Sequence, residues 1–232
     1  MSELPDPLVV RKRIERVPEK PFRMVCKAAY LLAARICEIV GKTYPYEKCY
    51  GLKGTDVFTD TYREAGEKYD AVVFRVQTAK RDGLIRNIGL PVDYEPWAWE
   101  LYEYCREFGK DYVFPFTRQK AWRKVVESGC FDGLNYLIYE YKVTKNGEPK
   151  SYPRQWRRFN LHALRHLRAQ ELVEFYGFDG FDLAAYCGWT IRTGQAFFGV
   201  STPASMARYL YLNWRAYFPK LLKKRMKMSL RC

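Results

Sequence analysis

The spacing of hydrophobic and polar positions divides the chain into short strands and longer helices. Two runs rich in valine and isoleucine, 71–77 and 84–90, flank a loop that contains Asp82-Gly83, and this arrangement predicts a β-hairpin. Asn146-Gly147 is a candidate turn for a second hairpin within 131–159. The strands are therefore expected in small antiparallel pairs.

Apolar residues recur at helical spacing in most of the remaining long stretches. Pro21 suits a first helical turn and Gly41 suits a C-terminal cap, which predicts one helix between them. Asn160 is a suitable N-cap for a helix that runs to Tyr176. Further helices are expected over 95–109, 117–128, 181–187 and, after Thr202-Pro203, 204–214.

This inventory predicts an α+β fold, mainly α with a small antiparallel β-sheet. Residues 42–69 are turn-rich. Residues 1–20 contain three prolines and a basic cluster, which is typical of an arm or linker with at most one short helix. Residues 21–232 are enough for one large domain. It is expected to end in a basic helix or tail that carries Lys220, Lys223, Lys224, Arg225 and Lys227.

The chain is strongly basic, with 40 Lys and Arg against 26 Asp and Glu and a formal net charge of +14 at pH 7. This excess favours an anionic partner, either nucleic acid or an acidic membrane surface. The apolar runs are far shorter than the roughly 20 residues that cross a bilayer, and no signal peptide is recognisable, so we expect a soluble, intracellular protein. The seven cysteines are scattered without a C-x-x-C pair, which indicates neither a disulfide framework nor a zinc site.

Arg35 stands in the apolar stretch AYLLAARICEIV, with Glu38 three residues further on. One interpretation is an ordinary ion pair on a helix surface. The other is that Glu38 holds the guanidinium so that its remaining donors bind an anion, because this planar group fits two phosphate oxygens. The residues alone leave both interpretations open.

The only two histidines, His162 and His166, lie on either side of Arg165 in the stretch LHALRH. Their i, i+3 and i+4 spacing predicts that all three side chains project in about the same direction from a helix. They are either partly buried structural residues or a phosphate site beside a helix N-terminus, where free N–H groups favour anions. Lys80, at the tip of the first hairpin, is either simply solvated or reaches a nucleic-acid groove or an active site.

Taken in order, these segments resemble the motifs of the tyrosine recombinases, the phage-type integrases. AARICEI resembles the first arginine box of that family, TAKRDGLIRNIGLP resembles its lysine-bearing hairpin, and YVFPF resembles the segment before its next helix. HALRH is similar to the H-x-L-R-H box, YCGWT to the Gly-His or Gly-Trp box, and MARYLYL to the nucleophile segment. The six segments follow the family's order and span about 21–215.

The resemblance implies a tyrosine recombinase-like catalytic domain, an enzyme that cleaves and rejoins DNA strands through a 3′-phosphotyrosyl link without metal, ATP or another cofactor. It implies Tyr209 as the nucleophile. Arg35 and Arg165 would neutralise the pentacoordinate phosphorane, and Lys80 would protonate the leaving 5′-oxygen. The implied role is site-specific recombination or integration of DNA.

The remaining positions of the motifs have accessory roles by the same resemblance. His162 would share the proton of the tyrosine, and Trp189 would donate its indole N–H or pack beneath the nucleophile. Glu38 and His166 would support the site. The implied partners are double-stranded DNA and further copies of the chain, assembled on DNA as a dimer or tetramer, with no membrane involved.

A basic and aromatic segment, 142–158, is the leading candidate for an additional DNA contact. A solvated basic hairpin packed by its own tyrosines is the alternative interpretation. The cations concerned are Lys142, Lys145, Lys150, Arg154, Arg157 and Arg158.

The chain departs from the family's pattern in two places. The interval from Trp189 to Tyr209 is longer than is usual, which leaves Tyr211 as an alternative nucleophile and allows a tyrosine that acts on a neighbouring subunit. Only 34 residues precede Arg35, where complete members carry a core-binding domain, so the chain is either a catalytic fragment or works without that clamp. Two alternative functions stay open: a type IB topoisomerase-like DNA-relaxing enzyme, and a catalytically inactive DNA-binding protein of the same fold.

Overall fold

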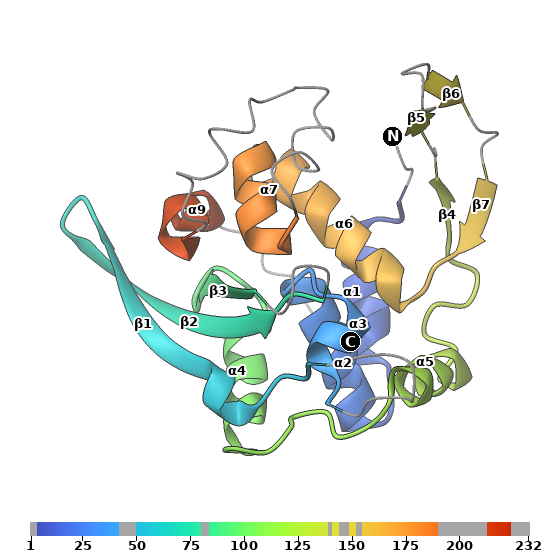
Figure 1. Ribbon diagram of the computed structural model, residues 1–232, viewed down its shortest axis with the longest axis horizontal. Coiled ribbons are helices and arrows are strands. Elements are labelled where there is room, and N and C mark those ends of the chain that lie inside the picture. Colours follow the sequence, from blue (N-terminus) through green and yellow to red (C-terminus); the bar gives the residue numbers. More distant parts are fainter. Residues whose placement is uncertain are drawn as a thin grey trace.

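The computed structural model describes residues 4–41, 50–79, 84–138, 141–143, 149–151, 155–189 and 213–223. Within them the chain forms a mixed fold of helices and small antiparallel sheets (Figure 1). The helices are α1 (Pro7–Glu15), α2 (Lys20–Leu31), α3 (Ile36–Ile39), the 3-10 helix η1 (Gly54–Asp56), α4 (Ala98–Arg106), α5 (Arg118–Glu127), α6 (Leu161–Glu174), α7 (Gly180–Cys187) and α9 (Trp214–Leu221). The strands are β1 (Val57–Glu64), β2 (Glu67–Gln77), β3 (Ile85–Pro91), β4 (Asn135–Ile138), β5 (Tyr141–Val143), β6 (Pro149–Ser151) and β7 (Gln155–Arg158).

Helix α2 forms the centre of the core, because small and apolar residues fill most of its positions. Every residue from Met24 to Leu31 is buried. The helix contacts α1, α4, α5 and α6. Helix α1 adds Val10 and Ile14, both with no exposed surface, to the same core. The prediction for residues 1–20 allowed at most one short helix, and α1 is that helix, packed against α2.

Helix α2 ends at Leu31, well before the expected end at Gly41. Ala33 takes the left-handed backbone conformation with φ 42°. The N–H groups of Ala33 and Ala34 donate to the carbonyls of Tyr30 and Ala29, which is the hydrogen-bond pattern of a Schellman cap. The chain restarts as the short helix α3 with Arg35 as its N-cap. No glycine or proline marks this break, so helical spacing alone predicted a single helix.

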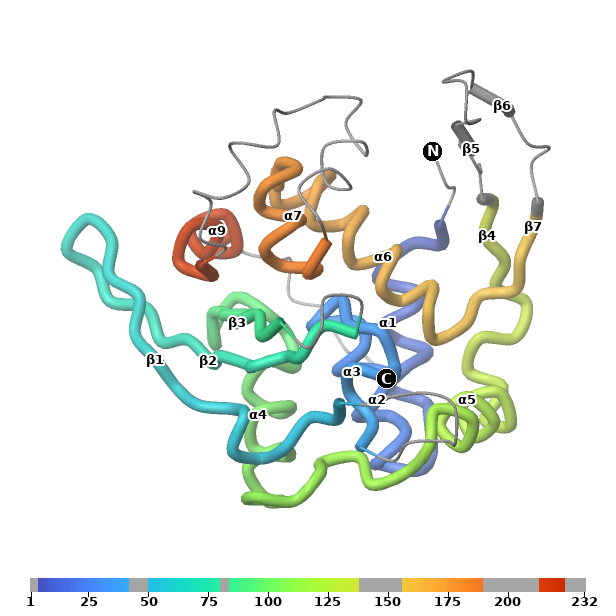
Figure 2. The backbone as a smooth tube through the Cα atoms, viewed as in Figure 1, coloured from blue at the N-terminus to red at the C-terminus, as the bar shows by residue number. Residues whose placement is uncertain are grey.

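The three-stranded antiparallel sheet has the strand order β1-β2-β3. Strands β2 and β3 confirm the first predicted hairpin, although its Asp82-Gly83 turn lies outside the described residues. Strand β1, within the segment expected to be turns, was missed because it is an edge strand with mostly polar, partly exposed residues. It joins β2 through Ala65 and Gly66, both at positive φ, rather than through a typical hairpin dipeptide. This β1–β2 hairpin extends away from the rest of the molecule (Figure 2).

A second antiparallel ribbon pairs β4 with β7 and β5 with β6, which confirms the second predicted hairpin. Its Asn146-Gly147 turn lies outside the described residues. The ribbon stands beside α6, and β7 leads directly into that helix (Figure 1). The start of α6 is fixed by Asn160, as predicted, because its Oδ1 accepts the N–H groups of His162 at 2.9 Å and Ala163 at 3.2 Å.

The three-stranded sheet lies between helices on its two sides. Helix α4 contacts β1 and β2, whereas α7 and α9 contact β3 (Figure 1). Helices α4, α5 and α7 agree with the predicted segments 95–109, 117–128 and 181–187 to within a few residues at each end. Most of the helix expected over 204–214 lies outside the residues that the structure describes.

Candidate active site

Glu38 is a buried carboxylate around which three arginines gather, and its side chain has 0% exposure. Its Oε1 accepts Nη1–H of Arg35 at 2.9 Å and the backbone N–H of Ala79 at 3.2 Å. Its Oε2 accepts the backbone N–H of Arg35 at 3.1 Å and Nη2–H of Arg86 at 3.2 Å. Nη1 of Arg165 lies 3.7 Å from the same oxygen. One carboxylate thus joins α3, the β2–β3 hairpin and α6.

The charge balance at Glu38 leaves positive charge in excess. Burial by itself raises the pKa of this carboxyl, but Arg86, Arg165 and the N–H groups of Arg35 and Ala79 outweigh burial, so its pKa is lowered. Glu38 is therefore ionised at neutral pH. Three guanidinium groups share this single negative charge, an arrangement that favours a further anion nearby.

Arg165 lies on the inner side of α6, and only 2% of its side chain is exposed. Its Nη1 donates to the Ala33 carbonyl at 2.6 Å and its Nη2 donates to the Cys187 carbonyl at 2.8 Å. Burial lowers its pKa to about 10, so the group stays charged at neutral pH. Cys187 is the last residue of α7, where carbonyls lack partners within the helix, and Ala33 belongs to the turn that follows α2. Arg165 therefore binds one helix end and the turn after another helix while it faces Glu38.

Arg86 of β3 is a second buried arginine of this cluster, and the sequence reasoning missed it. Its Nη1 donates to the Cys187 carbonyl at 2.7 Å and its Nη2 donates to the Leu32 carbonyl at 3.2 Å. Arg86 shares the inner face of β3 with the buried residues Ile88 and Leu90. A cation at an inward position of a strand was the signal that could have identified it.

Gly188 allows the end of α7 to approach the arginines closely. Its φ is +66°, and a Cβ there would lie 2.5 Å from Nη1 of Arg86 and 2.9 Å from Cγ2 of Thr78. Trp189 follows, with its ring centroid 5.8 Å from Cζ of Arg165. The structure thus brings Trp189 to the same cluster as Arg35, Glu38 and Arg165.

The two histidines differ in their surroundings. His162 is exposed and His166 is partly buried, and their rings meet edge to face with centroids 4.9 Å apart. Burial, with smaller effects from His162 and Arg165, lowers the pKa of His166 to about 4, so this ring is neutral at pH 7. The prediction that His162, Arg165 and His166 project in the same direction is only partly correct. Arg165 turns into the core, whereas His162 is exposed to solvent.

Helix α6 is held in place by a second buried network one turn beyond Arg165. The fully buried Arg168 donates from Nη1 to Oε2 of Glu171 at 2.6 Å and from Nη2 to the Tyr186 hydroxyl oxygen at 3.1 Å. The Tyr30 hydroxyl donates to the same carboxylate oxygen of Glu171 at 2.7 Å. These contacts tie α6 to α2 and α7, the two helices beside whose C-terminal ends Arg165 lies.

Lys80, Tyr209 and Tyr211 lie outside the described residues, as do Lys145 and Arg154 of the basic segment. Ala79, directly before Lys80, reaches the cluster through its N–H.

The remaining cations of the basic segment lie on the second ribbon. Arg157 and Arg158 are exposed on β7. Lys142 of β5 is the register partner of Lys150 of β6. The ribbon therefore carries cations on three of its four strands.

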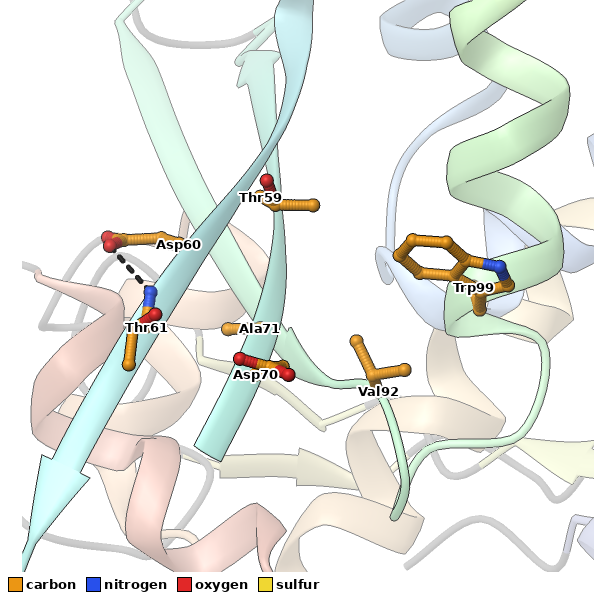
Figure 3. A pocket seen from close by; sticks show the side chains of 7 residues that line it. All are labelled: Thr59, Asp60, Thr61, Asp70, Ala71, Val92 and Trp99. Atoms are coloured by element: carbon orange, nitrogen blue, oxygen red, sulfur yellow. Dashed lines mark hydrogen bonds between the residues drawn. The ribbon is translucent and has the colours of Figure 1, made fainter. Parts of the chain in front are cut away.

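A hollow of about 670 Å³ on β1, β2 and α4 is lined by residues other than this cluster (Figure 3). Its lining is Thr59, Asp60, Thr61, Asp70, Ala71, Val92 and Trp99. Asp60 pairs with Arg215 at 2.6 Å, and Asp70 lies 3.7 Å from Lys68. Because its charged lining residues are carboxylates, we assign this hollow no part in binding an anion.

No family model, curated protein or solved structure matches this chain. Among the residues that the structure describes, no helix combines the length and apolar character needed to cross a bilayer. In the same part of the chain, no group of three or more His, Cys, Asp or Glu side chains is placed to hold a metal ion. The described cysteines, none of which forms a disulfide, are Cys26, Cys37, Cys105, Cys130 and Cys187.

Proposed function

We propose that this chain is the catalytic domain of a site-specific DNA recombinase of the tyrosine recombinase type. The observation that carries the proposal is the convergence on Glu38 of Arg35, the hairpin backbone at Ala79 and Arg165. These three segments are far apart in the sequence, and each belongs to a motif that resembles the family. A phosphate site needs such donors, fixed by the fold and carrying more positive than negative charge.

Arg35 is the arginine best placed to contact a DNA phosphate. One of its nitrogens pairs with Glu38, while 21% of its side chain is exposed. Arg165 is almost fully buried, and its Nη1 and Nη2 donate to carbonyls. In the proposed reaction Arg35 donates to the non-bridging oxygens of the phosphorane. Arg165 and Arg86 do not contact the phosphorane but add positive charge from their buried positions beside Glu38.

The proposed reaction exchanges one phosphate ester for another. The Tyr209 hydroxyl attacks the phosphodiester, the bond to the 5′-oxygen breaks, and Lys80 gives that oxygen a proton. The exposed His162 accepts the proton of the tyrosine, and the indole N–H of Trp189 donates to a phosphate oxygen. A phenol with an ordinary pKa of about 10 ionises more easily beside this excess of cations. The roles of Tyr209 and Lys80 rest on the resemblance.

The substrate that we propose is double-stranded DNA, bound by a dimer or tetramer of the chain. The net charge of +14 supplies affinity for phosphates that does not depend on base sequence. The ribbon that carries Arg157 and Arg158 has the form of a two-stranded β-structure, which fits the major groove of B-DNA. Both arginines are exposed and precede the site helix α6.

The test is covalent capture on DNA in the absence of metal. The chain is incubated with a pool of nicked suicide duplexes of randomised sequence, and protein–DNA adducts are separated under denaturing conditions. We expect an adduct from the wild type and from Tyr211→Phe, but none from Tyr209→Phe. An adduct that survives in Tyr209→Phe and disappears in Tyr211→Phe would assign the nucleophile to Tyr211. Relaxation of any supercoiled plasmid without a preferred sequence would favour the topoisomerase-like function.

The burial of Arg165 favours one alternative, a DNA-binding protein of the same fold without catalysis. Its Nη1 and Nη2 already donate to Ala33 and Cys187, as a purely structural arginine would. The same assay separates the two functions. If the wild type binds the duplex pool tightly but forms no adduct on any substrate, the non-catalytic DNA-binding function replaces the recombinase function.

A further inference from the structure

A hollow of about 240 Å³ adjoins the segments that form the candidate active site. It is lined by Tyr50, Gly51, Lys53, Asp56, Arg75, Gln77, Ile85 and Tyr112. The Tyr50 N–H donates to the carbonyl of Cys37 at 3.0 Å, two residues after Arg35. On the other side, Gln77 lies two residues before Ala79, whose N–H donates to Glu38. Short stretches of backbone therefore connect the hollow to the Glu38 cluster.

The walls of this hollow are held by backbone hydrogen bonds between three segments. Leu52 N–H donates to the Ile39 carbonyl at 2.8 Å, and Val113 N–H donates to the Leu52 carbonyl at 2.8 Å. Lys53 and Tyr112 form an antiparallel bridge. Because these contacts are made within the chain itself, the hollow is formed before any ligand binds.

Two cations in the lining contact aromatic rings and are not paired with carboxylates in the described part of the chain. Nζ of Lys53 lies 5.2 Å from the ring centroid of Tyr112, and Cζ of Arg75 lies 5.4 Å from that of Phe58. Neither cation forms an ion pair with a carboxylate in the described part of the chain. A ring holds a cation in position without neutralising its charge, so both side chains keep donors for an anion.

The Tyr112 ring rests against backbone with part of its surface, although the residue is 37% exposed. A Cβ on Gly41 would lie 2.2 Å from its Cγ, and one on Gly51 would lie 2.6 Å from its Cδ1. The ring therefore rests against two glycine backbones and carries Lys53. Because Lys53 lies over this ring and Arg75 adds a second cation to the lining, the hollow favours a phosphate over a nucleobase as the ligand.

The carboxylate of Asp56 also lines the hollow, where its Oδ2 accepts the backbone N–H of Lys53 at 2.9 Å. Lys53 and Arg75 together outweigh this single negative charge. The lining as a whole is therefore positive.

We propose that this hollow binds a backbone phosphate of the DNA strand, near the phosphate that Arg35 engages. Lys53 and Arg75 would donate to its non-bridging oxygens, with the Gln77 amide as a further donor. Such a contact carries no sequence information but fixes the position of the strand, so that the cleaved phosphate is presented to Arg35. The identity of the ligand as DNA rests on the proposed function.

The test compares the salt dependence of DNA binding between variants of equal charge. Lys53→Gln with Arg75→Gln removes two charges from the hollow. The matched control, Arg63→Gln with Lys68→Gln, removes two charges from cross-strand partners near the far end of the β1–β2 hairpin. A third variant, Lys53→Arg with Arg75→Lys, keeps the charge of the hollow. Fluorescence anisotropy with one labelled duplex gives Kd at several salt concentrations, and thermal denaturation checks that each variant is folded.

We expect the slope of log K against log salt to become shallower by about 1 in the hollow variant, since each neutralised phosphate contributes about 0.9. The control and the charge-keeping variant should retain the wild-type slope. An equal change in the hollow variant and the control would overturn the proposed phosphate site. If instead the slopes behave as expected but the wild type forms no tyrosyl adduct, the recombinase function fails and the phosphate site stands.

Discussion

Replacing Glu38 by glutamine tests whether one buried carboxylate organises the cluster. Each of its oxygens accepts two N–H donors, Oε1 from the Arg35 side chain and Ala79, and Oε2 from the Arg35 backbone and Arg86. A glutamine amide has one oxygen and one NH₂ group. In either orientation, therefore, the NH₂ group faces two donors that have lost their acceptor.

The expected loss of stability follows from these contacts. A buried donor left without a partner costs about 1–3 kcal/mol, and two donors are affected. Arg86 and Arg165, 4% and 2% exposed, also lose the negative charge that offsets their burial. Breaking a buried ion pair costs about 3–5 kcal/mol, so we expect the free energy of unfolding to fall by that amount. This is a large part of the roughly 5–15 kcal/mol typical of a native protein.

Urea titration at pH 7, followed by tryptophan fluorescence, measures this free energy of unfolding. The matched control is Glu127→Gln, whose ion pair with Lys124 at 3.5 Å involves a carboxylate that is 53% exposed. We expect it to change the free energy of unfolding by less than about 1 kcal/mol. If Glu38→Gln lost no more stability than Glu127→Gln, the central place given to Glu38 would be refuted.

Two further predictions concern Ala33 and His166. Ala33→Gly should change the free energy of unfolding by less than about 1 kcal/mol. Relief of the left-handed conformation contributes about 1–2 kcal/mol, and this is offset by the greater unfolded-state entropy of glycine and by the loss of a buried methyl group, each about 1 kcal/mol. A loss above about 2 kcal/mol in urea titration would contradict this. His166 has a folded-state pKa of about 4, below its unfolded value near 6.5, so the unfolded chain takes up the proton first as pH falls. The stability contributed by the neutral ring is thus complete above pH ~6.5 and is lost as pH falls toward 4. Urea titrations should show wild type losing about 1–2 kcal/mol relative to His166→Gln over that range, after allowance for the partly exposed ring, and a constant difference would argue against this reasoning.

Most helices and the two hairpins were predictable because their signals act over a few residues. Asn160 caps α6 through the next two or three N–H groups, and the valine-rich run that became β2 has the residue types that strands favour. The break after Leu31 was not predictable from such signals. The carbonyls of Leu32 and Ala33 are bound by arginines 54 and 132 residues away in the sequence. A helix end that depends on such distant donors leaves no local pattern.

The sequence by itself determined which chemical groups are available at the candidate site and their order along the chain: Arg35 with Glu38, the hairpin before Lys80, and Arg165 between two histidines. Only the tertiary structure decided how those groups are used. It left Arg35 partly exposed, buried Arg165 beside two helix ends, and added Arg86 as a third cation on Glu38. The physical reason is that burial and charge pairing depend on contacts between segments far apart in the chain, whereas spacing reports only on neighbours.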